Sequence, residues 1–135
     1  MRKLRSFGRR KMKTAINIGV GTADEFFKRS LDRAKKLDRG ERLQPEMRIT
    51  FEDPSELIRV MTGKRVELIH AIRRSPAAVS ELALTLNRDR AAVDRDVKLL
   101  ERLGLLATSF EDNPGHGRRK VVRSLAARYE LTATI

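Results

Sequence analysis

Hydrophobic and polar residues alternate in three short stretches of the chain, and this period of two predicts half-buried β-strands. The stretches cover residues 14–20, 47–51 and 128–135. In the first, Ile16, Ile18 and Val20 fall on one side of the strand. Such strands bury one face and leave the other exposed, so each needs a neighbouring layer to cover its apolar side.

A different pattern, with apolar residues every three to four positions, predicts an amphipathic helix over residues 23–38. Thr22 and Glu25 form an S/T-x-x-E capping box at its start, and Gly40 and Pro45 end it. One arc of this helix holds Phe26, Phe27, Ser30, Leu31, Ala34 and Leu37. The rest of its surface is mostly basic, so the aromatic arc is expected to need a partner surface.

Four further helices are predicted over residues 54–61, 64–74, 79–86 and 90–103. Asp53 followed by Pro54 marks the first start, and Asp89 is expected to cap the last helix. Asn87 lies where the turn between the last two helices needs a left-handed residue, and Gly104 lies just after the last helix. The residues expected to face the core are Leu57, Ile58, Val60, Met61, Leu68, Ile69, Ile72, Leu82, Ala83, Leu86, Val93, Val97, Leu100 and Leu103.

Two strands, 105–110 and 118–124, are predicted to follow as a hairpin around a turn-rich tip at 112–117. Three helices, with a short turn between the second and third, followed by a hairpin, are the layout of a winged helix-turn-helix. The predicted fold is therefore α+β: a winged helix-turn-helix with an N-terminal strand-helix-strand extension and a C-terminal strand. The expected parts are a basic flexible arm at 1–13, the extension at 14–52 and the winged-helix domain at 53–135.

The charge of the chain indicates what class of partner it binds. The chain has 135 residues, 30 Lys and Arg against 18 Asp and Glu, and a net charge of +12, which favours a polyanionic partner. Seven of these cations lie in residues 1–13, so subtracting seven from 30 leaves 23 basic against 18 acidic residues in the rest of the chain. Met12 is an alternative initiator, in which case most of the arm would not be native.

The helix predicted at 90–103 carries the candidate DNA-reading face, opposite its apolar seam. Small residues allow close approach to the major groove, and long cationic side chains reach guanine edges or phosphates. Arg88 and the helix N-terminus are expected to bind a phosphate, while Asp96, near the seam, is expected to pair internally. The candidate DNA-binding residues are Arg88, Arg90, Ala91, Asp94, Arg95, Lys98, Arg102, Arg118, Arg119 and Lys120, the last three on the wing. The alternative is a merely solvated polar face.

Several function classes are excluded or disfavoured. The chain has no Cys, which rules out disulfides, thiolate metal sites and a Cys nucleophile. His70 and His116, the two histidines, do not form a zinc site, and no catalytic Ser-His-acid pattern stands out. We therefore expect no catalysis, no metal, no cofactor and no membrane span, and a cytoplasmic location.

The runs ITFEDPSELIRVMTGKRVELIHAIRRS and SELALTLNRDRAAVDRDVKLLERLGLL resemble the MarR-like winged-helix regulators of archaea and bacteria. GTADEFFKRSLDRAKKLDRGE also looks like that group's N-terminal segment, so the resemblance covers residues 14–135. Ala78 stands where Ser or Thr usually caps the second helix, and Asn87 stands where Gly is usual. The resemblance implies a dimeric transcriptional regulator, and such proteins often neighbour a small toxin gene as its antitoxin.

A dimer is also expected on physical grounds, because one recognition helix with its wing contacts too few base pairs for selective binding. The strands at 14–20, 47–51 and 128–135 and the helix at 23–38 are predicted to form the interface; the alternative is a sheet within one chain. The predicted function is a homodimeric repressor that binds double-stranded DNA. Alternatives are an antitoxin that neutralises a small protein toxin through its N-terminal segment, and an RNA-binding winged helix.

Overall fold

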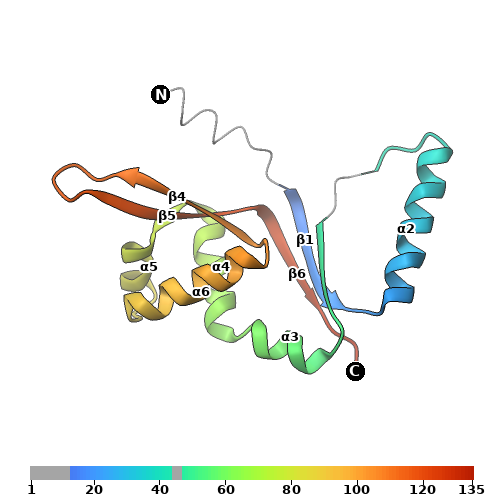
Figure 1. The fold of residues 1–135 in the computed structure, drawn as a ribbon, viewed down its shortest axis with the longest axis horizontal. Coiled ribbons are helices and arrows are strands. Elements are labelled where there is room, and N and C mark those ends of the chain that lie inside the picture. The colour runs from blue at the N-terminus through green and yellow to red at the C-terminus, as the bar shows by residue number, and fades with distance from the viewer. Residues whose placement is uncertain (1–12, 44–46) are drawn as a thin grey trace.

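Five helices and six strands make up residues 13–43 and 47–135, the part of the chain that the computed structural model describes (Figure 1). In chain order they are β1 (Lys13–Val20), α2 (Ala23–Asp38), β2 (Met47–Phe51), α3 (Pro54–Val60), α4 (Gly63–Arg74), β3 (Ala77–Ala78), α5 (Val79–Thr85), α6 (Arg90–Arg102), β4 (Leu106–Asp112), β5 (Arg118–Ser124) and β6 (Ala126–Thr132). Most predicted elements are present within one or two residues of their expected bounds. The predicted basic arm lies outside the described residues, except for Lys13, which begins β1.

A parallel three-stranded sheet joins the two ends of the described chain. Its order is β2-β1-β6, with Ile16 of β1 opposite Met47 of β2 and Tyr129 of β6. Because β1 is hydrogen-bonded on both sides, the alternative of an intrachain sheet is the one found, and the prediction that these strands pair across a dimer is wrong for β1. β6 also ends at Thr132 rather than residue 135.

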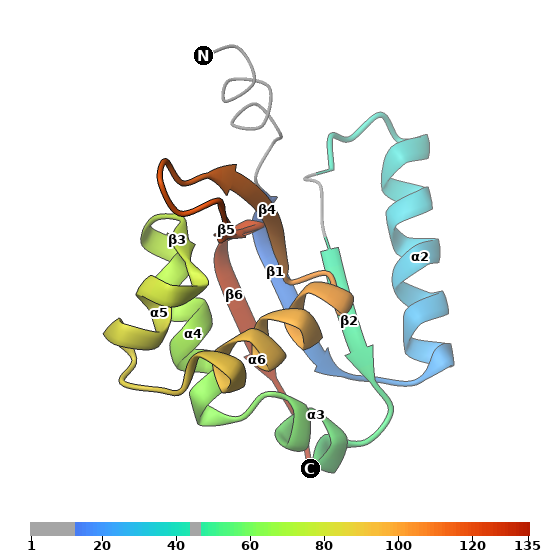
Figure 2. The ribbon, with the colours of Figure 1, turned by 60° about the vertical axis from the view of Figure 1, so that its left-hand side comes forward.

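The winged helix-turn-helix is inserted between β2 and β6. Helices α4, α5 and α6 pack with an antiparallel sheet of order β3-β5-β4, in which the β4–β5 hairpin projects as the wing (Figure 2). The α+β winged-helix prediction is thus confirmed. The short strand β3, which pairs Ala77 with Val122, was not predicted, because two residues carry no visible alternation.

One hydrophobic core runs through both sheets. It contains Ile16 and Ile18 of β1 together with Leu68, Leu100 and Val122 of the winged helix, all five fully buried. The boundary expected between residues 52 and 53 therefore separates parts that share a core and a sheet. The turn after α6 also touches β2, since a Cβ on Gly104 would lie 2.8 Å from the Met47 methyl group.

Local turn chemistry follows the sequence closely. Asn87 has φ +52° and Gly104 has φ +83°, so both adopt the left-handed conformation that was expected of them. Asp89 is the N-cap residue of α6, but its side chain makes no capping hydrogen bond. Ile58, expected in the core, is 61% exposed, because Leu57 and Met61, one turn apart, form the inward stripe of this short helix.

Helix α2 stands apart from the rest of the described structure. Its start is as predicted, with the Glu25 N–H donating to Thr22 Oγ1 at 3.2 Å. None of its residues is buried, and both views show it beyond β2, away from the winged helix (Figures 1 and 2). No helix of the described residues has the length and apolar character needed to cross a lipid bilayer.

Candidate nucleic-acid interface

The two faces of α6 differ as the sequence predicts. Val93, Val97 and Leu100 are fully buried against the core. The opposite face is solvent-exposed and holds Arg90, Ala91, Arg95, Lys98 and Arg102, with Asp94 half-buried among them. Since the helix presents small and cationic side chains outward, its exposed face has the shape and charge suited to a major groove.

Asp94 connects this face to the wing. Its carboxylate accepts a hydrogen bond from Lys120 Nζ of β5 at 3.0 Å and forms an ion pair with Lys98 Nζ, one turn along α6, at 3.2 Å. The hydrogen bond from Lys120, with a further contribution from Lys98, lowers the pKa of Asp94 against the opposing effect of burial. The carboxylate therefore stays ionised and braces the wing against the recognition helix.

Lys120 belongs to the predicted DNA-binding set on the wing, and the structure gives it an internal partner. Its side chain is only 16% exposed and is bonded to Asp94, so it serves first as the brace. Arg118 and Arg119, the other two wing cations of the predicted set, are more open. The guanidinium of Arg118 lies 4.8 Å from the centre of the Phe110 ring, and Arg119 lies 3.7 Å from the carboxylates of Glu81 and Glu111.

A cleft of about 620 Å³ lies between the recognition helix and the wing. Its lining includes Arg90, Ala91, Asp94, Lys98, Phe110 and Lys120. Phe110 was not among the predicted site residues, although it is a large aromatic residue, 57% exposed, on β4. The sequence contained a signal for this residue, because Phe110 lies just before the turn-rich tip and the cations that follow it.

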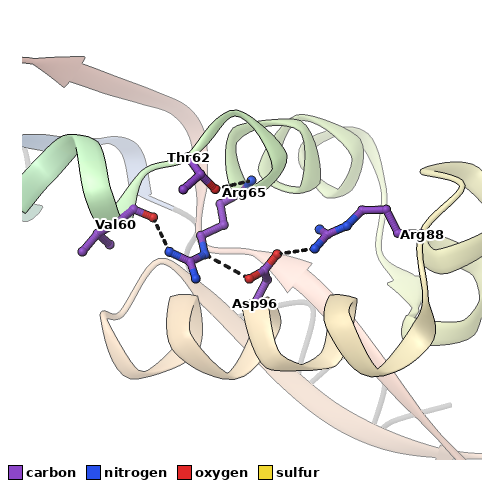
Figure 3. A network of polar contacts seen from close by, with 5 residues as sticks. All are labelled: Val60, Thr62, Arg65, Arg88 and Asp96. Carbon is purple, nitrogen blue, oxygen red and sulfur yellow. Dashed lines mark hydrogen bonds and ion pairs between the residues drawn. The ribbon is translucent and has the colours of Figure 1, made fainter.

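Arg88 is the clear departure from the predicted DNA-binding set. Its Nη2 donates to Asp96 Oδ2 at 2.7 Å, and its side chain is 12% exposed (Figure 3). Asp96 also accepts from Arg65 Nε at 3.0 Å, so the expected internal pairing of Asp96 is confirmed. The guanidinium of Arg88 is thus turned into the protein by this carboxylate, and its predicted phosphate contact stays a prediction.

Arg65 completes the network and ties three helices together. Its Nη1 donates to the Val60 carbonyl at the end of α3 at 2.8 Å, and its own N–H donates to the N-cap Thr62 at 3.4 Å (Figure 3). Asp96 thus links α6 to the start of α4 and to the turn that precedes α6. This network fixes the orientation of the recognition helix from its inner side.

Cationic side chains make up a large part of the cleft lining. Among the described residues, no group of three or more His, Cys, Asp or Glu side chains is placed to hold a metal ion. The cleft is lined by cations, by small apolar and aromatic side chains, and by one carboxylate already paired with two lysines. Such a surface can bind an anionic polymer by charge and hydrogen bonding.

The family model of HVO_A0114 matches residues 60–127, which run from the end of α3 through the wing to the start of β6. The chain belongs to the HVO_A0114 family. The matched residues contain α4, α5, α6 and both wing strands, and so the whole of the cleft described above. No curated protein matches the chain.

Three solved structures similar to the chain are described as regulators or DNA-binding domains. A possible transcriptional regulator from Methanosarcina mazei Go1 is 19% identical, covers 47% of this chain and has a TM-score of 0.43; the match spans just over half, 56%, of its own length. A homodimeric winged helix-turn-helix DNA-binding domain from Mycobacterium bovis, described as a possible ArsR-family transcriptional regulator, is 14% identical over 78% of this chain and 75% of its own, with a TM-score of 0.43. A MarR-like transcriptional regulator from Thermotoga maritima is 18% identical over 76% of this chain and 65% of its own, with a TM-score of 0.40.

Proposed function

We propose that this protein is a sequence-specific, double-stranded DNA-binding transcriptional regulator that acts as a homodimeric repressor and catalyses no reaction. Helix α6 would enter the major groove, and the β4–β5 wing would contact the sugar-phosphate backbone. One observation carries the proposal: the exposed cationic face of α6 and the wing meet at a single cleft, held in place by the Lys120–Asp94 hydrogen bond.

The residues at this cleft divide into two roles. Ala91 near the start of α6 leaves room for close approach, while Arg95 and Lys98 extend far enough to reach base edges. Arg118 and Arg119 on the wing are suited to phosphates, since guanidinium groups bind phosphate oxygens through paired hydrogen bonds. Base readout is thus assigned to α6 and backbone anchoring to the wing.

Homodimerisation follows from the footprint of one winged helix. A two-fold pair presents two recognition helices to a palindromic operator, with half-site centres about 34 Å apart or at a multiple of that distance. Because phosphate contacts release counterions, affinity should fall about 10³- to 10⁵-fold between 50 and 200 mM salt if six to ten phosphates are contacted.

The experiment begins with footprinting of the purified protein on the DNA upstream of its own gene. Binding of the protected duplex and of a random duplex is then measured by fluorescence anisotropy for wild type, Arg95→Ala and the control Arg59→Ala, an exposed arginine on α3. Arg95→Ala should cost about 1–3 kcal/mol on the protected duplex and little on random DNA. Equal losses on both would make Arg95 a phosphate ligand, and binding of neither duplex would overturn the proposal.

Two alternatives have distinct outcomes. If the winged helix binds RNA, structured RNA should displace the protected duplex at physiological salt better than unlabelled duplex does. If the protein is an antitoxin, the uncovered face of α2 is the surface on which a small protein toxin would dock. Stable co-purification with the product of the neighbouring gene would support this alternative.

A further inference from the structure

We infer that the outward face of α2 is a self-association surface, through which two copies of the chain pair with their α2 helices antiparallel. The inference rests on the proposed function only in supplying the interface for the proposed homodimer. The face is formed by Phe26, Phe27, Leu31 and Leu37, with the small Ser30 and Ala34 between them. We call it the α2 face.

The α2 face is open to solvent throughout the described structure. Phe26 is 62% exposed, Phe27 63%, Leu31 45% and Leu37 59%. The half-buried residues of this helix, Arg29 and Arg33, lie on the flank beside Phe26 and Leu37 at 100° per residue. Since none of these apolar side chains is buried, the apolar stripe of α2 does not cover the sheet of its own chain.

Such a helix needs a partner. An isolated helix of 16 residues is marginally stable in water, and most helical stability in proteins comes from packing an apolar face. From the exposed fractions and a full aromatic surface of about 150–250 Å², the α2 face offers on the order of 400 Å² of apolar area per copy. That is as large as the biggest patch on a typical monomer, and such patches mark interaction sites.

Charge selects a second copy in antiparallel orientation. The first turn of α2 is acidic and the last is basic. Asp24 and Lys35 are eleven residues apart, so at 100° per residue they lie on the same flank, beside Leu31, about 16 Å apart along the axis. A two-fold axis across an antiparallel helix pair brings the same flanks together. Asp24 of each copy then faces Lys35 of the other, which forms two ion pairs at once.

Any other helical partner would have to carry this charge order in reverse, whereas a second antiparallel copy carries it by symmetry. The free edge of β2 is on the same side of the sheet as α2 (Figures 1 and 2). In the described residues that edge has no strand partner, and proteins generally cover such edges.

The first test is the oligomeric state of the full chain in sedimentation equilibrium at micromolar concentrations. Wild type should be dimeric, and Phe27→Asp should raise the dimer dissociation constant at least about 100-fold, since it places a charge in the middle of an apolar contact. Ile58→Asp is the matched control, because Ile58 is equally exposed, at 61%, but lies on α3. Its dissociation constant should equal that of wild type, and unchanged melting temperatures should show that both variants are folded.

The second test reads the orientation of the helices. Asp24→Lys and Lys35→Glu should each weaken self-association about tenfold or more, because each turns two attractive contacts into repulsive ones. Mixing the two variants restores both contacts, so a heterodimer as tight as the wild-type dimer should form. Glu25→Lys, which makes the same charge change in the same turn on the far flank, should leave the dimer intact.

A monomeric wild type would overturn the inference, as would a dimer that Phe27→Asp does not weaken. Failure of the charge-swapped mixture to associate would refute the antiparallel arrangement. DNA binding is measured separately, so the two proposals can fail independently. A monomeric wild type that still protects its operator overturns the α2 interface and the proposed homodimer but leaves operator binding standing, whereas a dimer that binds no DNA overturns the proposed function and leaves the α2 interface standing.

Discussion

Asp96→Asn is the sharpest test of how the recognition helix is held. The substitution keeps the shape of the side chain but removes its charge and replaces one acceptor oxygen by an N–H donor. Two guanidiniums depend on this carboxylate, Arg88 at 2.7 Å and Arg65 at 3.0 Å, with side chains 12% and 23% exposed. One acceptor oxygen remains in the variant, so only one of the two guanidiniums can keep its bond to this side chain.

The cost follows from these contacts. A hydrogen bond to a charged group contributes about 1.5–3 kcal/mol, and leaving one partner of a buried ion pair unpaired costs about 3–5 kcal/mol. Arg65 keeps its bond to the Val60 carbonyl and is the more exposed of the two, so the lower part of this range applies. We expect a loss of about 3 kcal/mol, which lowers the melting temperature by about 10 °C in a domain of this size.

The assay is urea unfolding followed by circular dichroism, with Asp94→Asn as the matched control. Asp94 lies on the same helix, two residues earlier, and its side chain is 30% exposed, so its loss should cost about 1 kcal/mol or less. The m-value should not change in either variant. Equal losses for the two substitutions, or a loss below about 1 kcal/mol for Asp96→Asn, would refute the view that the inner network holds α6 in place.

Three further predictions concern single residues: Asp94, Asn87 and Tyr129. Because its folded pKa is lowered, Asp94 stabilises the protein above the ordinary pKa of an aspartate and loses that contribution as the pH falls through the lowered value. The stability difference between wild type and Asp94→Asn should therefore shrink as the pH falls below the ordinary pKa of an aspartate, in urea titrations at several pH values. Asn87→Ala should cost about 1 kcal/mol at φ +52°, whereas Asn87→Gly should be neutral within about 0.5 kcal/mol, by the same assay. Tyr129→Phe should cost about 1–2 kcal/mol, because the hydroxyl donates to the Leu105 carbonyl at 2.6 Å, and thermal melting measures this loss. Equal effects of the two Asn87 variants would contradict the role of the left-handed conformation at this position. An unchanged melting temperature for Tyr129→Phe would contradict a stabilising hydrogen bond to the Leu105 carbonyl.

Local features of the fold could be predicted because a few residues determine them. Asn87 and Gly104 mark left-handed turns by their own conformational preferences, and the seam of Val93, Val97 and Leu100 follows from helical periodicity alone. The pairing of β1 with both β2 and β6 could not be predicted, since alternation identifies a strand but does not name its neighbours. Two-residue β3 lies below the length at which any pattern can be seen.

In the candidate site, too, the features set by local geometry could be predicted and the contacts between distant residues could not. Helical geometry placed Ala91, Arg95 and Lys98 outward, and the structure agrees. Arg88 and Lys120 were expected to face DNA because both are cations next to the predicted interface. In the structure each forms an ion pair with an aspartate of α6, Arg88 with Asp96 and Lys120 with Asp94. Those contacts join residues 8 and 26 positions apart in the chain, and a sequence pattern cannot resolve which of many cations a given aspartate will select.

The parallel pairing of β1 with β6 has a consequence for the order of events during synthesis. β1 leaves the ribosome long before its neighbour β6, and the entire winged helix must be translated in between. One edge of the central strand β1 therefore has no hydrogen-bonding partner until β6 has been synthesised. During most of its translation the nascent chain exposes an unpaired strand edge, which can pair with other chains. Chaperone capture at this stage, and aggregation of chains stalled before residue 126, are the cellular costs that this topology brings.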